Sequence, residues 1–267
     1  MAAEHGNQSV ERAITVLSAF GDGRSLRVSE VAQRAGLGQS TTSRLLATLE
    51  ALEFVDRDPV STLYRIGPAV VPLAGVALNQ HPVHRAARQP AQELAASLGL
   101  GVNVSVRRGD SLSYLCNFEG RSAPRSFVLI GQRNPLHATG MGKCLLVALS
   151  AEQRRVLLPD LHQFTPTTVA SHEDLDQVIA DVGRKGYAIE REELALGRAC
   201  VAAPILNDSG EVVAALSISG PLSAIDLDTR EHELSRVAIE VADSISISLG
   251  YMGPAAVPFT ETHVNAP

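Results

Sequence analysis

Apolar residues recur at helical spacing in two short segments near the start of the chain, separated by glycines. In residues 28–35 the apolar side chains fall on one helical face, Val28, Val31, Ala32 and Ala35. In residues 40–52 a second face carries Thr42, Leu45, Leu46, Leu49 and Leu52. Gly36 and Gly38 lie between the segments, where glycine permits a sharp reversal of the chain. The pattern predicts a helix-turn-helix.

A helix is also expected ahead of this pair. Val10, Ile14, Leu17 and Phe20 repeat at helical spacing, and they should supply the surface on which the other two helices pack. Asn7 or Ser9 can serve as the N-cap of this helix, because both side chains accept hydrogen bonds from free backbone amides.

The outer face of the 40–52 helix carries small side chains and one arginine. It presents Ser40, Ser43, Arg44, Ala47 and Ala51, flanked by Thr41 and Thr48. A helix that enters the DNA major groove needs a low profile, hydroxyls for phosphates and an arginine that reaches guanine or phosphate. The face of an ordinary helix pair in solvent would carry Glu and Lys instead. The composition favours DNA binding over that alternative.

Two strand-like runs follow this helix directly. Residues 54–57 and 63–66 flank a turn that is rich in Asp, Pro and Ser, which predicts a β-hairpin. A hairpin in this place is the wing of a winged helix. Arg57 and Arg65 of the hairpin are then expected to meet the phosphate backbone.

From Gly101 onward the pattern changes to short strands with helices between them. Alternating valines at 102, 104 and 106 predict a half-buried strand. Further strands are expected at 113–118, 127–130, 200–206 and 212–219, and helices at 142–149, 173–185 and 228–249. Residues 207–210, Asn-Asp-Ser-Gly, predict a hairpin turn. These elements indicate an α+β domain around an antiparallel sheet.

The chain of 267 residues therefore divides into three segments. We expect a winged helix-turn-helix domain at 8–67, linker helices at 68–99 and a second domain at 100–251, with loose tails at both ends. The linker should contain two helices, because His81-Pro82 interrupts an apolar helix at 68–79 and Pro90 lies within the next one, 83–98.

Charge limits how the first domain can bind DNA. The whole chain carries a net charge of −6, and residues 1–66 hold seven arginines, no lysine and eight acidic residues, a net charge of −1. Binding would have to come from a local cluster of Arg27, Arg44, Arg57 and Arg65. Such a module gains little non-specific affinity from counterion release. We therefore expect two copies to bind two half-sites together.

The sequence does not favour a membrane protein, a secreted protein, a metalloprotein or an enzyme. No apolar run is long enough for a membrane span and the start lacks a secretory signal, so we expect a cytoplasmic protein. Cys116, Cys144 and Cys200 are far apart, without metal-ligand spacing. Residues 140–143 are not a P-loop, and residues 217–220 lack the leading glycine of a nucleophile elbow. We expect no metal, no cofactor and no catalytic residue.

Three stretches together resemble the isocitrate-lyase-regulator (IclR) family of bacterial transcription factors. They are QSVERAITVLSAF running into LRVSEVAQRAGLGQSTTSRLLATLE, NPLHATGMGKCLLVAL at 134–149, and REELALGRACVAAPILNDSGEVVAALSISGP at 191–221. The resemblance implies an N-terminal winged helix, a C-terminal effector domain like a GAF domain, and dimers or tetramers. It also implies operator binding, more often as a repressor, that changes when a small metabolite binds.

Residues of the second domain also fit a small-molecule site when the resemblance is left aside. Ser217 and Ser219 are two apart on a strand, so both hydroxyls face the same side. Residues 139–142 precede a helix, whose free backbone N–H groups suit a carboxylate. An organic acid is the favoured ligand class. By resemblance, the effector contacts are Gly140, Met141, Glu190, Cys200, Ser217 and Ser219.

The candidate DNA contacts come from both helices and the hairpin. They are Arg27, Gln39, Ser40, Thr41, Ser43, Arg44, Thr48, Arg57 and Arg65. The alternative function is an enzyme or a thiol-based sensor built on the C-terminal domain, with chemistry at Cys200. A cysteine buried in a strand is usually inert, which favours the regulator.

Overall fold

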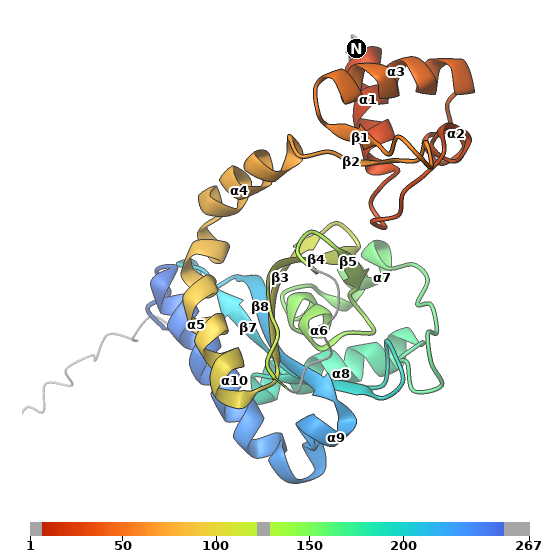
Figure 1. Cartoon of the computed structure of the whole chain (residues 1–267). Helices are drawn as coiled ribbons and strands as arrows, with labels where there is room; N and C mark the ends of the chain where they lie inside the picture. The colour runs from red at the N-terminus through yellow and green to blue at the C-terminus, as the bar shows by residue number, and fades with distance from the viewer. Residues whose placement is uncertain (1–6, 122–128, 254–267) are drawn as a thin grey trace, which may run out of the picture. The chain divides into compact units, whose positions relative to one another are not determined.

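The structure is a computed structural model that describes residues 7–121 and 129–253 (Figure 1). The chain separates into two compact units, and the division falls between Gln80 and His81. Residues 127–128 of the predicted strand at 127–130 lie outside the described residues, as do most of the predicted tails, and residues 129–130 do not form a strand. No helix in the described ranges has the length and apolar character needed to cross a membrane.

The N-terminal unit is a winged helix-turn-helix, as predicted. Its elements are α1 (Gln8–Ser18), α2 (Val28–Ala35), α3 (Gln39–Ala51), β1 (Val55–Arg57), β2 (Tyr64–Ile66) and α4 (Val70–Gln80). The strands β1 and β2 pair antiparallel, with Val55 opposite Ile66. Leu26 bridges to Tyr64, so the segment before α2 joins the hairpin.

Local sequence explains where these helices begin and end. The Asn7 side chain accepts a hydrogen bond from the Ser9 backbone N–H at 3.2 Å and caps α1, so of the two predicted caps Asn7 is the one used. Gly36 ends α2 in the left-handed conformation with φ of 64°, and Gly38 is the N-cap of α3.

The core of this unit corrects two expectations about which side chains are buried. Val16 of α1 and Phe20 just after it pack into the core, whereas Val10 and Ile14 are more than half exposed. The helix has two apolar stripes, and spacing alone does not say which one faces the partner helices. Leu52 is also exposed, because α3 ends at Ala51 and its last face no longer points inward.

The α4 helix is apolar but unburied. None of its residues is buried, and Val71, Leu73 and Val76 are largely exposed. An apolar helix without cover within its own chain is typical of a surface that binds another molecule.

The C-terminal unit is built on one antiparallel sheet in the order β5-β4-β3-β8-β7-β6 within the described residues. The strands are β3 (Gly101–Arg108), β4 (Ser111–Phe118), β5 (Arg133–Pro135), β6 (Ala188–Arg191), β7 (Arg198–Leu206) and β8 (Val212–Pro221). The helices are α5 (Pro82–Leu98), α6 (Gly140–Leu146), α7 (Ala151–Leu157), α8 (His172–Lys185), α9 (Leu222–Ile225) and α10 (Leu227–Ser248). This is the predicted α+β architecture.

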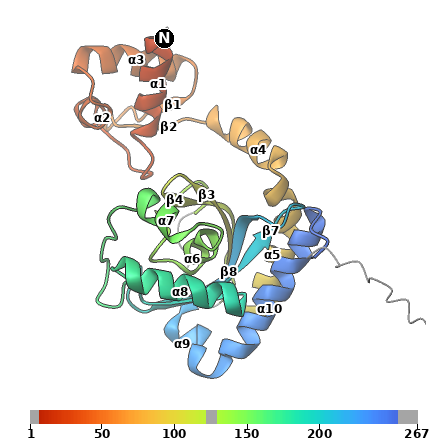
Figure 2. The same cartoon turned by 180° about the vertical axis from the view of Figure 1, so that it is seen from behind.

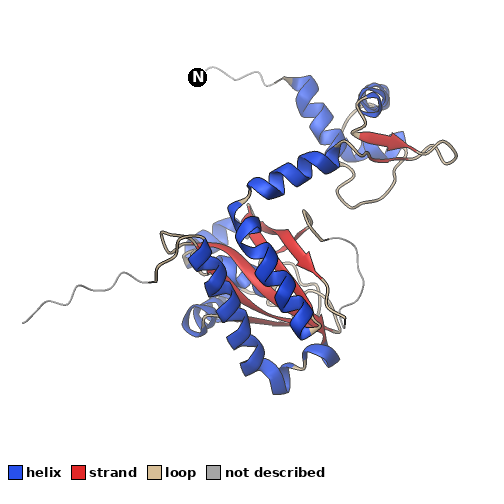
Figure 3. Cartoon of the chain, turned by 60° about the vertical axis from the view of Figure 1, so that its left-hand side comes forward, coloured by secondary structure: helices blue, strands red, loops and turns tan. Residues whose placement is uncertain are grey.

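Helices cover both faces of this sheet. The α5 and α10 helices lie side by side against one face, and α6, with α8 behind it, covers the other (Figures 1, 2 and 3). The predicted long final helix is confirmed, with Leu234, Ala238 and Ile245 buried. Because α5 packs on β3 and β4, the structure groups it with the C-terminal unit.

Burial on both sides corrects the prediction of a half-buried strand at 102–106. Asn103 and Ser105 are buried along with the valines of β3. The polar side chains alternate as expected but face α6 instead of solvent, so their hydrogen bonds must be made inside the protein. The predicted helix at 142–149 is observed at Gly140–Leu146, two residues earlier.

Several elements had no clear signal in the sequence. The edge strands β5 and β6 and the short helices α7 and α9 each span three to seven residues. Such short segments show less than two full periods of any hydrophobic pattern.

Leu46 and Leu52, both on the predicted inner face of α3, should differ sharply in mutational cost. Leu46→Ala removes a fully buried side chain and should lower the free energy of unfolding by about 2–5 kcal/mol. Leu52→Ala removes an exposed one and should change it by about 0.5 kcal/mol or less. Guanidinium unfolding of the full chain, followed by circular dichroism, measures both. Equal losses would contradict the observed end of α3.

Candidate functional sites

The outer face of α3 is exposed as the DNA-binding hypothesis requires. Gln39, Ser40, Ser43, Arg44 and Thr48 are all exposed, and Thr41 is half-buried. The Thr48 hydroxyl donates to the Arg44 carbonyl oxygen at 3.1 Å. No acidic residue of α3 precedes Glu50, so the first three turns present hydroxyls, an amide and one cation.

The arginines of the hairpin are partly committed to neighbours in their own chain. Arg65 donates twice to Asp56 Oδ2, at 2.9 and 2.6 Å. Arg57 lies over the Tyr64 ring, 5.5 Å from its centroid. Asp56 therefore offsets the charge of Arg65, which sequence reasoning had counted as a free cation. Arg27 precedes α2, and its backbone N–H donates to Glu30 at 2.7 Å.

All six predicted effector residues line one cavity of about 230 Å³ in the C-terminal unit. Glu190, Cys200 and Ser219 stand directly opposite one another on β6, β7 and β8, so their side chains share one face of the sheet. Ser217 lies two residues along β8, and Gly140 and Met141 approach from the start of α6. The cavity is smaller than a drug-sized pocket and suits a small metabolite.

Glycine permits the close approach of α6 to the sheet. A Cβ at Gly140 would lie 2.8 Å from Cys200 Sγ, and one at Gly142 would lie 2.1 Å from the Leu136 carbonyl oxygen. Thr139 caps the helix, because its hydroxyl oxygen accepts from the Gly142 N–H at 3.1 Å. The start of α6 is thereby held against β7.

Two hydroxyls in the cavity are oriented as hydrogen-bond donors. Asn117 donates to Asn103 Oδ1 at 2.8 Å, and Asn103 in turn donates to Ser219 Oγ at 3.2 Å. Asn134 donates to the Tyr114 hydroxyl oxygen at 2.9 Å. Because each oxygen already accepts a bond, the O–H of Ser219 and of Tyr114 is left to donate to a ligand.

The cavity is lined by a buried carboxyl group and by an exposed cation. Glu190 is 7% exposed, and burial raises the pKa of its carboxyl group. Its Oε1 accepts from the Glu193 N–H at 2.7 Å. Lys143 is almost fully buried but pairs with Glu193 and not with Glu190. The cation among the lining residues is Arg198, which is exposed.

Sequence reasoning missed several residues that line this cavity. They are Asn103, Tyr114, Leu129, Asn134, Leu194, Ala195, Arg198 and Ala199. Asn103 carried a usable signal, since a polar residue amid alternating valines is expected either in solvent or at a site. Tyr114 and Asn134 carried none, because only the pairing of β4 with β5 brings them together.

The cysteines are poorly suited to thiolate chemistry. Burial raises the pKa of Cys116 to about 11 and that of Cys144 to about 12, and it raises the pKa of Cys200 well above its ordinary value. A reactive thiol needs a lowered pKa and access to solvent. Among the described residues no group of His, Cys, Asp and Glu is arranged to hold a metal ion.

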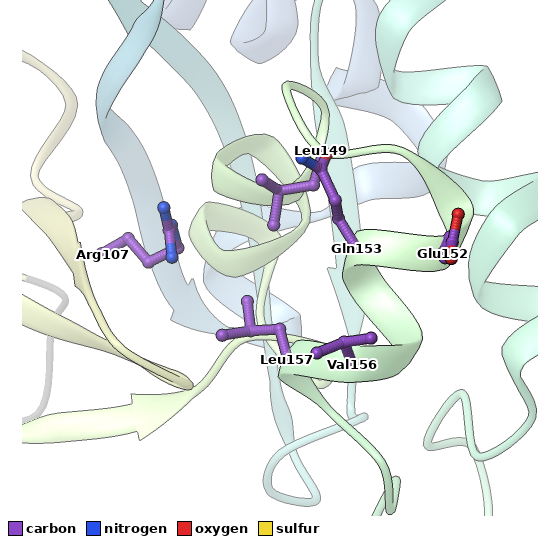
Figure 4. Close-up of a pocket in the computed structure, with 6 residues that line it drawn as sticks. All are labelled: Arg107, Leu149, Glu152, Gln153, Val156 and Leu157. Atoms are coloured by element: carbon purple, nitrogen blue, oxygen red, sulfur yellow. The ribbon is translucent and has the colours of Figure 1, made fainter.

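A second recess, of about 480 Å³, lies between the end of β3 and α7 (Figure 4). Arg107, Leu149 and Leu157 face it, while Glu152 points away from Arg107. It contains none of the predicted effector residues and no oriented hydroxyl pair, so the smaller cavity is the better candidate for ligand recognition.

Comparison with known protein families identifies the family of both units. Residues 9–59 match the IclR helix-turn-helix domain, and residues 75–247 match the bacterial transcriptional regulator IclR C-terminal domain. The chain belongs to the IclR family. It is therefore a DNA-binding transcription regulator with an effector domain.

Two named transcriptional regulators match this chain over nearly their whole length. The HTH-type transcriptional repressor AllR of Escherichia coli K12 is 35% identical over 93% of this chain and 92% of its own. The HTH-type transcriptional regulator XynR of the same strain is 32% identical over 91% of this chain and 98% of its own.

Solved structures share the fold. The IclR transcriptional regulator of Alicyclobacillus acidocaldarius superposes with a TM-score of 0.81 at 30% identity, covering 92% of this chain and 100% of its own. An IclR homologue of Microbacterium hydrocarbonoxydans, solved in complex with 4-hydroxybenzoate, has a TM-score of 0.78 at 23% identity, with 91% and 99% coverage.

The native protein should resist thiol reagents. With all three cysteines of the sequence buried and their thiol pKa values raised, Ellman's reagent at pH 7.5 should react slowly with the folded chain. In 6 M guanidinium it should label three thiols at once, which serves as the control. Rapid native labelling that disappears in Cys200→Ser would instead support a thiol sensor.

Proposed function

We propose that this protein is a repressor that binds operator DNA through α3 and the hairpin and releases it when a small organic acid fills the C-terminal cavity. The observation that carries the proposal is the convergence of two donor hydroxyls, Ser219 and Tyr114, with the cation of Arg198 around 230 Å³ of space. Donors and a cation are what a carboxylate needs.

Glu190 narrows the proposed ligand class. A second carboxylate in the cavity repels a bound acid unless it accepts a hydrogen bond from the ligand. A hydroxylated acid suits both sides of the cavity, because its carboxylate would lie toward Ser219 and its hydroxyl would donate to Glu190. The 4-hydroxybenzoate complex of the Microbacterium homologue is an instance of such a ligand in this fold.

The effector contacts proposed here are those named from the sequence. Gly140, Met141, Glu190, Cys200, Ser217 and Ser219 would touch the ligand. Cys200 would do so as a small apolar wall, because its thiol stays protonated at neutral pH. Burial of Ser217 beside the cavity supports a direct role for its hydroxyl.

The proposed DNA contacts form a single group around α3. They are Arg27, Gln39, Ser40, Thr41, Ser43, Arg44, Thr48, Arg57 and Arg65. Exposure of the outer face of α3 supports this assignment. We retain 8–67 as the DNA-binding segment, 68–99 as the linker and 100–251 as the effector segment.

We further propose that the protein acts as a dimer or tetramer. The exposed apolar side chains of α4, Val71, Leu73 and Val76, support self-association, as do Val10 and Ile14 of α1. The net charge of −6 supports it as well, since one weakly basic module gains little from counterions and two modules on paired half-sites gain more.

Fluorescence anisotropy with DNA from the protein's own promoter region tests the proposal. A thermal-shift screen of small hydroxy acids first identifies a ligand, because a compound that binds the native state raises the melting temperature. The full chain should bind this DNA selectively, in a salt-sensitive manner, and the ligand should weaken that binding. No selective binding at any salt concentration would refute the proposal.

The double variant Ser217→Ala/Ser219→Ala separates the two sites. Loss of two hydrogen bonds should weaken ligand binding about tenfold or more, while affinity for DNA without ligand stays unchanged. Calorimetry measures the first and anisotropy the second. Ser248→Ala, on the exposed end of α10, is the matched control and should alter neither. Joint loss of both activities would show that β8 is only structural.

Glu190 should make ligand binding depend on pH. Its folded pKa is raised, so the carboxylate takes up a proton while the pH is still above the ordinary range for glutamate. Affinity for an ionised acid that has no hydroxyl group to donate to Glu190 should rise as the pH falls through this raised pKa, because the repulsion disappears. Glu190→Gln should flatten the dependence, and Glu211→Gln should leave it intact. A pH profile that Glu190→Gln does not change would contradict this role.

A further inference from the structure

A recess on the N-terminal unit joins two helices that the sequence does not connect. It lies between α1 and α3 and has a volume of about 450 Å³. Its polar lining is Ser9 and Arg12 from α1 and Thr41, Arg44 and Thr48 from α3, and Leu45 and Ala47 complete it. Ser9 and Arg12 are three residues apart on one helix. Thr41, Arg44 and Thr48 repeat at three and four residues on the other, so each set shares a face.

The lining is cationic and rich in hydroxyls. It holds two guanidinium groups, three hydroxyls and no carboxylate. In the part of the chain that the structure describes, neither Arg12 nor Arg44 forms a salt bridge, whereas Arg34 and Arg65 pair with Asp22 and Asp56. Two unpaired guanidinium groups held on adjacent helices are suited to a single anion with several oxygens.

We propose that Arg12 and Arg44 hold one backbone phosphate of the operator in this recess. The inference rests on the DNA binding proposed above and adds α1 to the surface that touches DNA. The phosphate would lie where the edge of the major groove passes α1 while α3 enters the groove, as an earlier helix crosses the backbone in related motifs. Arg12 is half-buried, so its guanidinium is held in place before DNA arrives.

The assignment has a consequence for base recognition. If Arg44 contacts a phosphate, then the side chains left to reach base edges are those nearer the start of α3, namely Gln39, Ser40 and Ser43, which are all exposed. Phosphate contacts set the register of a protein on the duplex without carrying sequence information. Arg12 therefore adds affinity and not selectivity.

Arg12→Ala tests the site by salt dependence. Affinity for promoter DNA and for an unrelated duplex should fall by the same factor, about tenfold at 0.1 M salt. The slope of log K against log salt should become shallower by about 0.9, the loss of one phosphate contact. Arg24→Ala removes the same charge from an exposed loop of the same unit and should leave the slope unchanged.

Single methylphosphonate substitutions in the promoter duplex locate the contact. At one phosphate the neutral linkage should weaken the native chain, weaken Arg12→Ala and Arg44→Ala less, and have no added effect on the double variant Arg12→Ala/Arg44→Ala. Arg12→Lys should recover part of the affinity, and circular dichroism checks that each variant is folded.

The outcomes separate this inference from the proposed function. Native protein that fails to bind the promoter selectively refutes the proposed function. Native protein that binds, with Arg12→Ala of equal affinity, overturns only the phosphate site. So does a weakened Arg12→Ala that responds to methylphosphonate at every position as strongly as the native chain, because the loss would then be structural.

Discussion

The C-terminal unit depends on the close approach of α6 to β7. Gly140 lies so near Cys200 Sγ that a Cβ there would force the helix away from the sheet, and a Cβ at Gly142 would collide with the Leu136 carbonyl oxygen in the segment before the helix. Because α6 is seated this closely, its first residues reach the row formed by Glu190, Cys200 and Ser219. The cavity exists at the place where this helix begins.

Covering the sheet on both faces creates the chemistry of that cavity. Asn103 on β3 is buried and Asn117 and Ser219 on the neighbouring strands are half-buried, so these side chains bond to one another as the chain Asn117–Asn103–Ser219. An unpaired polar group at such a site would cost roughly 1–3 kcal/mol. The same pairings leave selected protons pointing into the cavity. Lys143 and Glu193 neutralise each other beneath it, while Glu190 keeps a carboxyl group whose charge burial disfavours.

The DNA-binding unit has few arginines available for DNA. Asp22 and Asp56 offset Arg34 and Arg65 within the unit, which leaves a small set of arginines around α3. A regulator of this kind derives little affinity from charge alone and more from register, paired half-sites and correctly placed groups. In the proposed dimer, binding to DNA would be sensitive to how the two copies are joined, which suits control by a ligand that binds elsewhere.

The sequence alone determined the winged helix, the α+β class, the family and the six residues that meet at the cavity. Helical period, the turn glycines and the Asn-Asp-Ser-Gly hairpin are local signals, and each is contained within about ten residues of chain. Tertiary structure decided which of two apolar stripes on α1 is buried, because both have the same period. It also decided the pairing of Asn134 with Tyr114, of Lys143 with Glu193 and of Arg12 with Arg44 in one recess. Those partners lie 20 to 50 residues apart, and only the pairing of β4 with β5, the packing of α6 on the sheet and the packing of α1 on α3 bring them together.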